Sequence, residues 1–153
     1  LLDPASLPEV VHQAGRRNID DAVRNYERCR VQADVRPYIE DMAEAYRWAD
    51  LVLCRAGALT IAELSVLGQP AMLIPSPNVA EDHQTRNAEA LVEKQAARMV
   101  PDHGEEEVLV ENMLELLEQE EEQKNLSDHI KELGIADAAE RIASEVFKIV
   151  EQT

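Results

Sequence analysis

The sequence predicts an α/β fold: a doubly wound parallel sheet followed by a helical C-terminal tail. Up to residue 100, short apolar runs alternate with longer amphipathic runs, which is the pattern of βαβ units. The short runs are continuously apolar, as in strands that are covered on both faces. From residue 105 onward the chain is helical in pattern, with a turn near 133–137.

The predicted elements follow in order along the chain. Helix 40–49 has apolar residues at three- and four-residue spacing. Helix 58–67 is followed by Gly68 and Pro70, which are residues that end helices. We expect strands at 9–13, 31–35, 51–54, 71–75 and, more weakly, 96–100, and helices at 20–30, 40–49, 58–67 and 82–95.

Length and composition indicate one globular lobe over 1–153, with 105–153 as its mostly helical tail. The chain has 153 residues, 45% of them hydrophobic, and no apolar run that approaches the length of a membrane span. Its first residues lack the basic region of a signal peptide. Because the chain begins without Met, we expect it to be a fragment of a larger protein.

The net charge and the absence of several catalytic motifs argue against some classes of function. A net charge of -16 argues against nucleic acid and anionic membrane surfaces as direct partners. The sequence has no HExxH, GxSxG or Asp-x-Asp motif, so we predict no metal and no cofactor. Cys29 and Cys54 are expected to be free, buried thiols. His12 is expected to be a packed or edge histidine and no catalyst, and His103 and His129 are given no role.

Ligands of such sheets bind beyond the carboxyl ends of the strands. The segments after strands 51–54 and 71–75 are therefore the expected site. Arg55 directly follows the first of these strands. Its guanidinium can reach an anionic ligand or pair with a carboxylate of the fold, and the second role is favoured.

The segment "RAGALTIAE" suits a phosphate. Gly57 permits a tight turn, and the N–H groups of Ala58, Leu59 and Thr60 are donors at the positive end of a helix dipole. The Thr60 hydroxyl adds a donor, and Glu63, one turn further on, can accept hydrogen bonds from the two hydroxyls of a ribose. Equally, Thr60 and Glu63 fit a capping box that only satisfies the helix start. The local pattern leaves both interpretations open.

A second polar segment, "NVAEDHQTRNA", follows strand 71–75. Gln84 and Asn87 share a helix face, with His83 beside them, and amides and imidazole can bind sugar hydroxyls as donor or acceptor. The alternative is an ordinary polar helix start in which Glu81 and Asp82 complement the dipole. Locally this alternative is favoured.

These motifs together carry a family resemblance. Residues 38–100 contain Arg-x-Gly-Ala-x-Thr-x-x-Glu, then Gly-x-Pro, then His-Gln-x-x-Asn-Ala. This stretch resembles the C-terminal, donor-binding half of the MurG family, which are two-lobed GT-B glycosyltransferases of family 28. More thinly, the similarity extends from 10–15 to 137–150. The resemblance implies a Rossmann-like lobe whose first strand, with its Gly-Gly-Ser loop, is missing before residue 10.

The resemblance also implies roles for individual residues. The segment from Ala58 to Glu63 would bind the nucleotide diphosphate, with Glu63 on the ribose. Ile39 would present its backbone to the uracil edge, and Met42 would wall the pocket. Gln84, with His83 and Asn87, would bind N-acetylglucosamine. The substrate-binding residues predicted in this way are Ile39, Met42, Arg55, Ala58, Leu59, Thr60, Ile61, Ala62, Glu63, His83, Gln84 and Asn87.

The activity implied by the resemblance is the inverting transfer of N-acetylglucosamine from UDP-N-acetylglucosamine to lipid I, in peptidoglycan synthesis and thus in cell shape and division. The helix dipole and hydrogen bonds would stabilise the leaving diphosphate. The base and the lipid I site would lie in the missing N-terminal lobe, so no catalytic residue is assigned here. The whole enzyme would be peripheral on the cytoplasmic face of the inner membrane, without membrane contact by this lobe.

Two other functions remain open at this point. The chain can be a stand-alone donor subunit of a split GT-B glycosyltransferase. It can also be a non-catalytic α/β interaction module, in which Thr60 and Glu63 form only a helix cap.

Overall fold

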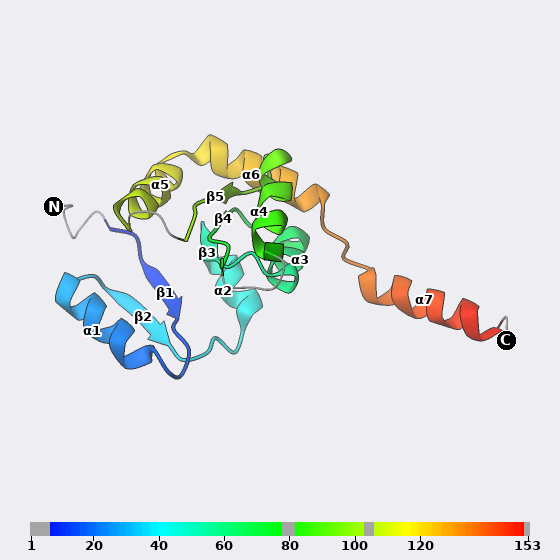
Figure 1. The fold of residues 1–153 in the computed structure, drawn as a ribbon, viewed down its shortest axis with the longest axis horizontal. Coiled ribbons are helices and arrows are strands. Elements are labelled where there is room, and N and C mark those ends of the chain that lie inside the picture. The colour runs from blue at the N-terminus through cyan, green and yellow to red at the C-terminus, as the bar shows by residue number, and fades with distance from the viewer. Residues whose placement is uncertain (1–6, 78–81, 103–105, 152–153) are drawn as a thin grey trace. The chain divides into compact units, whose positions relative to one another are not determined.

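The computed structural model describes residues 7–77, 82–102 and 106–151 (Figure 1). By their internal contacts the residues form two compact units, Leu1–Trp48 and Ala49–Thr153. Each unit has its own parallel sheet. The two units are therefore described one after the other.

The first unit is a single βαβ motif followed by a short helix. It contains β1 (Val10–Gln13), α1 (Ile19–Cys29), β2 (Ala33–Arg36) and α2 (Met42–Trp48). The two strands are parallel and in register from Val10 opposite Ala33 to Gln13 opposite Arg36. His12 packs edge-on against Tyr26 of α1, with 5.8 Å between the ring centroids, so the expectation of a packed histidine is confirmed.

The second unit continues the alternation and adds three helices. It contains β3 (Val52–Cys54), α3 (Ala58–Leu67), β4 (Ala71–Leu73), α4 (His83–Glu93), β5 (Arg98–Met99), α5 (Glu106–Glu118), α6 (Glu120–Glu132) and α7 (Ala138–Glu151). The sheet order is β3-β4-β5, all parallel. The carboxyl ends of its three strands therefore lie along one edge, which is where ligands of α/β sheets bind.

The core of the second unit lies between its sheet and the α5–α6 pair. Met72 from β4, Leu116 from α5 and Leu126 from α6 meet there with Val100. Met72 and Leu116 have no exposed surface. All three residues of β4 are buried, as expected for a central strand that is covered on both faces.

Helices α3 and α6 pack closely because glycine lies at two of their contacts. At Gly134, a Cβ atom would come within 2.6 Å of the Ser65 carbonyl oxygen, so no larger residue fits without a shift. Gly68 ends α3 with φ of 69°, a left-handed conformation that glycine adopts without strain. Its carbonyl accepts a hydrogen bond from the Ser127 hydroxyl of α6 at 2.6 Å.

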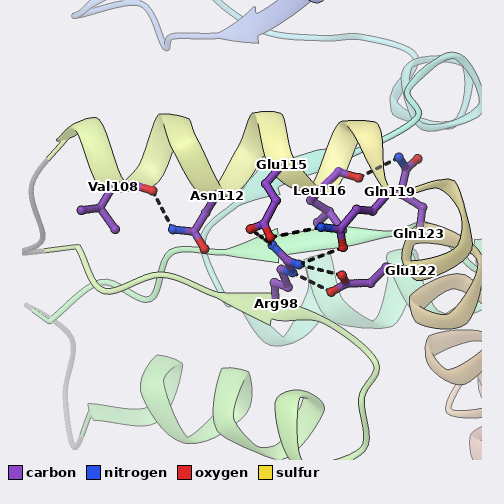
Figure 2. A network of polar contacts seen from close by, with 8 residues as sticks. All are labelled: Arg98, Val108, Asn112, Glu115, Leu116, Gln119, Glu122 and Gln123. Atoms are coloured by element: carbon purple, nitrogen blue, oxygen red, sulfur yellow. Dashed lines mark hydrogen bonds and ion pairs between the residues drawn. The ribbon is translucent and has the colours of Figure 1, made fainter.

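A polar network attaches the α5–α6 pair to the edge strand β5 (Figure 2). Arg98 donates to both carboxylate oxygens of Glu122, each at 2.6 Å. It also donates to Glu115 at 3.1 Å. These hydrogen bonds, that to Glu122 above all, raise the pKa of the Arg98 guanidinium. The arginine thus holds two helices to one strand with fixed geometry.

Predicted and observed elements agree closely. Helix 58–67 is observed with those bounds, and the turn expected near 133–137 separates α6 from α7. The helical tail has one further break, at Gln119 between α5 and α6, that was not predicted. The strands lie within the predicted segments except that β2 ends at Arg36, one residue later.

One expectation from the composition is wrong. Cys29 is exposed and Cys54 is only partly buried, although both thiols are free as predicted. Cys29 is the last residue of α1, a helix with no buried residue, so its thiol faces water. The prediction for His103 falls outside the described residues. Among the helices that are described, none combines the length and the apolar character needed to cross a bilayer.

Candidate functional site

The loops after β3, β4 and β5 are joined by one side chain. Arg55, directly after β3, forms an ion pair with Asp102 at 2.7 Å and donates to the Ile74 carbonyl at 3.1 Å. Ile74 follows β4, and Asp102 lies three residues after β5. The structural role favoured for Arg55 is therefore confirmed, while a contact between its guanidinium and a ligand stays a prediction.

Helix α3 begins at this edge without a side-chain cap. Its N-cap is Gly57, with φ of -72° and ψ of 142°, and its first helical bond runs from the Ile61 N–H to the Gly57 carbonyl. The N–H groups of Ala58, Leu59 and Thr60 have no backbone acceptor among the described residues. They are the donors of the first helical turn, and they form the positive end of the helix dipole.

The capping-box interpretation of Thr60 is therefore wrong. Thr60 is the third residue of the helix, not the residue before it, and no side chain caps this end. The Thr60 Oγ1 atom lies 3.8 Å from where a Cβ of Gly57 would be. The hydroxyl is thus beside the helix start, where it adds a donor to the three N–H groups.

The remaining predicted residues of α3 divide between surface and interior. Glu63 is exposed one turn after Thr60, and Ala62 is exposed beside it, whereas Ile61 is half-buried. Leu59 has an exposed fraction of 82%. A carboxylate and an apolar side chain are therefore both presented to solvent at the start of α3.

Two amides on α4 are held in one orientation each by backbone groups of the neighbouring loops. Gln84 Oε1 accepts a hydrogen bond from the Ser76 N–H at 2.9 Å, and Asn87 Nδ2 donates to the carbonyl of Ala56 at 3.1 Å. Gln84 therefore has its NH₂ left to donate, and Asn87 has its oxygen left to accept. A ligand hydroxyl group can therefore accept a hydrogen bond from the Gln84 NH₂ group and donate one to the Asn87 oxygen.

The start of α4 differs from the start of α3. Its N-cap, Asp82, has φ of 52° and makes no side-chain cap bond, although Asp82 accepts from the Thr85 hydroxyl at 2.6 Å. His83, the first residue of the helix, is exposed. The alternative of an ordinary polar helix start accounts for Asp82, whereas Gln84 and Asn87 bond to backbone groups of the neighbouring loops.

Cys54 lies at the base of this site as the last residue of β3. Burial raises the pKa of its thiol to about 11. The thiol is therefore protonated at neutral pH and is no nucleophile there. The described residues contain no group of three or more His, Cys, Asp or Glu side chains that could hold a metal ion.

Two predicted residues lie in the first unit. Ile39, between β2 and α2, is buried with an exposed fraction of 7%, and its N–H donates to Gln13 Oε1 at 2.9 Å. Met42 is the first residue of α2 and is half-buried. The contacts predicted for them with a base stay predictions.

Sequence reasoning missed three residues that shape these loops: Gln13, Ser76 and Asp102. Gln13 is the last residue of its strand, and Ser76 and Asp102 each lie three residues after the end of a strand. That position was the available signal, because polar residues just beyond parallel strands gather at one edge of the sheet.

Comparison with known proteins now identifies the fold of this site. Residues 5–142 match the model of the glycosyltransferase family 28 C-terminal domain. The chain belongs to glycosyltransferase family 28. In this family, a relative from Cytophaga hutchinsonii is 53% identical over 116 residues, which are 76% of this chain and 31% of the relative. A relative from Marinobacter nauticus is 43% identical over 145 residues, 94% of this chain and 40% of the relative.

Both family 28 relatives are named UDP-N-acetylglucosamine–N-acetylmuramyl-(pentapeptide) pyrophosphoryl-undecaprenol N-acetylglucosamine transferase. The crystal structure of Acinetobacter baumannii MurG matches with a TM-score of 0.83 at 27% identity, over 95% of this chain and 46% of that one. This chain therefore spans less than half the length of the family members that it matches.

Proposed function

We propose that this chain is the donor-binding lobe, over 1–153, of a transferase that moves N-acetylglucosamine from UDP-N-acetylglucosamine to lipid I. The names of the family 28 relatives and the match to MurG support the reaction. The start of α3 supports the binding role, because three N–H groups without a backbone acceptor in the described part of the chain lie within two turns of an exposed carboxylate on the same helix.

In this proposal the first turn of α3 binds the diphosphate. The N–H groups of Ala58, Leu59 and Thr60 would donate to phosphate oxygens, as helix N-termini do in many phosphate sites. As the glycosidic bond breaks, negative charge grows on the diphosphate, and these oriented donors would stabilise it. Glu63 would accept hydrogen bonds from the two ribose hydroxyls.

The sugar would bind beside α4. The NH₂ group of Gln84 and the oxygen of Asn87 have no partner of their own within the described residues. They would form hydrogen bonds with one or more hydroxyls of N-acetylglucosamine, and His83 lies nearby on the same helix. The acceptor, its activating base and the attachment to the cytoplasmic face of the membrane would be supplied by other parts of the whole protein.

Calorimetric titration of the 153-residue chain with UDP-N-acetylglucosamine tests the proposal. We expect the wild type to bind and Glu63→Ala to weaken binding by about 1–3 kcal/mol, because ribose hydroxyls lose their acceptor. Glu118→Ala, which removes an exposed carboxylate at the end of α5, is the control for charge and should bind like the wild type. Equal affinities for all three proteins would contradict the assignment of Glu63.

A further inference from the structure

A hydrogen bond in the first unit occupies the Ile39 N–H, a backbone group that the family resemblance assigns to the uracil edge. Gln13, the last residue of β1, accepts the Ile39 N–H through Oε1 at 2.9 Å. Because β1 and β2 are parallel, both residues lie beyond or at the carboxyl ends of neighbouring strands. This is the edge where ligands of such sheets bind.

The two partners differ in freedom to move. The Ile39 side chain is buried, and two residues later the Asp41 carboxylate accepts the Glu44 N–H at 2.8 Å at the start of α2. The Ile39 backbone is therefore held from both sides. Gln13 is exposed, and among the described residues its side chain makes one hydrogen bond, the one to Ile39.

The chemistry of the bond resembles that of a base contact. Uracil has a carbonyl oxygen beside an N–H group, and one residue's peptide N–H and C=O complement that pair. The carboxamide oxygen of Gln13 is an acceptor of the same kind as the uracil carbonyl. A single N–H makes one well-aligned hydrogen bond, so the two oxygens compete for it.

We propose that the Gln13 carboxamide takes the place of a uracil carbonyl on the Ile39 N–H in the empty protein and leaves when a uridine nucleotide binds. This inference rests on the proposed function and on the contact between the Ile39 backbone and the uracil edge that the family resemblance predicts. Gln13 then lowers the affinity for uridine nucleotides. When the nucleotide binds, the Ile39 N–H exchanges one oxygen acceptor for another, and this exchange contributes little binding free energy. Gln13 also keeps the N–H satisfied when no nucleotide is present.

The sign of a substitution effect separates this role from that of a structural brace. Gln13→Leu removes the acceptor, and Gln13→Asn shortens the side chain so that it no longer reaches Ile39. In both variants the empty protein has an unsatisfied N–H, so we expect UDP to bind about fivefold more tightly. The control is Gln32→Leu, at an exposed glutamine of the same unit, which should leave the affinity unchanged. If the Gln13 side chain only stabilises the loop at Ile39, both Gln13 variants should bind UDP more weakly.

A measurement on the unaltered protein gives an independent answer. In nuclear magnetic resonance spectra, a nuclear Overhauser effect between the Gln13 side chain and the Ile39 amide should be present without ligand and lost at saturating UDP. Persistence of this contact in the UDP complex, or unchanged or weakened binding by the Gln13 variants, overturns the inference. If UDP binds and Glu63→Ala weakens it, the proposed function survives that result. If the wild type binds no UDP, both fail.

Discussion

The two units of the chain differ in how they are packed. Among the residues that the structure describes, the largest fully buried side chains lie in the second unit: Leu64, Met72, Leu73, Leu116 and Ile130. In the first unit, only Ile39 and Tyr46 among the described residues are buried apolar side chains. The groups proposed to bind the diphosphate and the sugar thus lie on helices α3 and α4, which belong to the unit with the dense core. The proposed base contact relies on local hydrogen bonds, which exchange more easily than packed side chains.

The largest expected effect comes from breaking the dense core. Leu116→Ala should lower the free energy of unfolding by about 2–5 kcal/mol, because it removes buried methyl groups and leaves a cavity. Val23→Ala in α1 is the matched change in the first unit, where the side chain is 36% exposed, and should have an effect of about 0.5 kcal/mol or less. Urea unfolding followed by circular dichroism measures both. Similar losses would show that the units do not differ in packing as described.

A pair of glycines sharpens the comparison. Gly134→Ala should lower the free energy of unfolding by about 2 kcal/mol, because its Cβ would lie 2.6 Å from the Ser65 carbonyl and push α3 from α6. Gly15→Ala meets no atom within 4 Å and is strained only by its φ of 76°, so about 1 kcal/mol is expected. Thermal unfolding of both variants tests the order. The reverse order would place the closer packing in the first unit.

The smallest expected effect concerns the two thiols. The Cys54 pKa is raised by burial from 9.0 to about 11, so the unfolded chain loses this proton first as the pH rises. The free energy of unfolding should therefore fall by about 1 kcal/mol more in the wild type than in Cys54→Ala between pH 8 and 10. Cys29→Ser, at the exposed thiol of the first unit, should behave like the wild type. An identical pH dependence in Cys54→Ala would show that the thiol is not held neutral by burial.

Much of the fold follows from local pattern. The apolar runs and the Gly68 stop locate strands and helices because burial and helix termination are decided by neighbouring residues. The division of the strands into β1-β2 and β3-β4-β5 was not predicted. It depends on which strands pair, and no local signal encodes that.

The location of the candidate site could be predicted from the sequence, but the partners in its hydrogen bonds and ion pairs could not. The donors at the start of α3 follow from Gly57 and the strand before it. The choice between a cap at Thr60 and a cap at Gly57 required coordinates, since both positions fit the sequence. The pairings of Arg55 with Asp102 and of Gln13 with Ile39 join residues 47 and 26 positions apart. Such separations are outside the reach of spacing arguments.

The hydrogen bond from Asn87 to the Ala56 carbonyl ties the helix proposed to hold the sugar to the peptide just before the one proposed to hold the phosphates. Neither group can shift by itself without straining that bond. Affinities for the two halves of a nucleotide sugar should therefore be non-additive: occupation of one half prepares the other, and a ligand that carries both binds more tightly than the separate pieces imply.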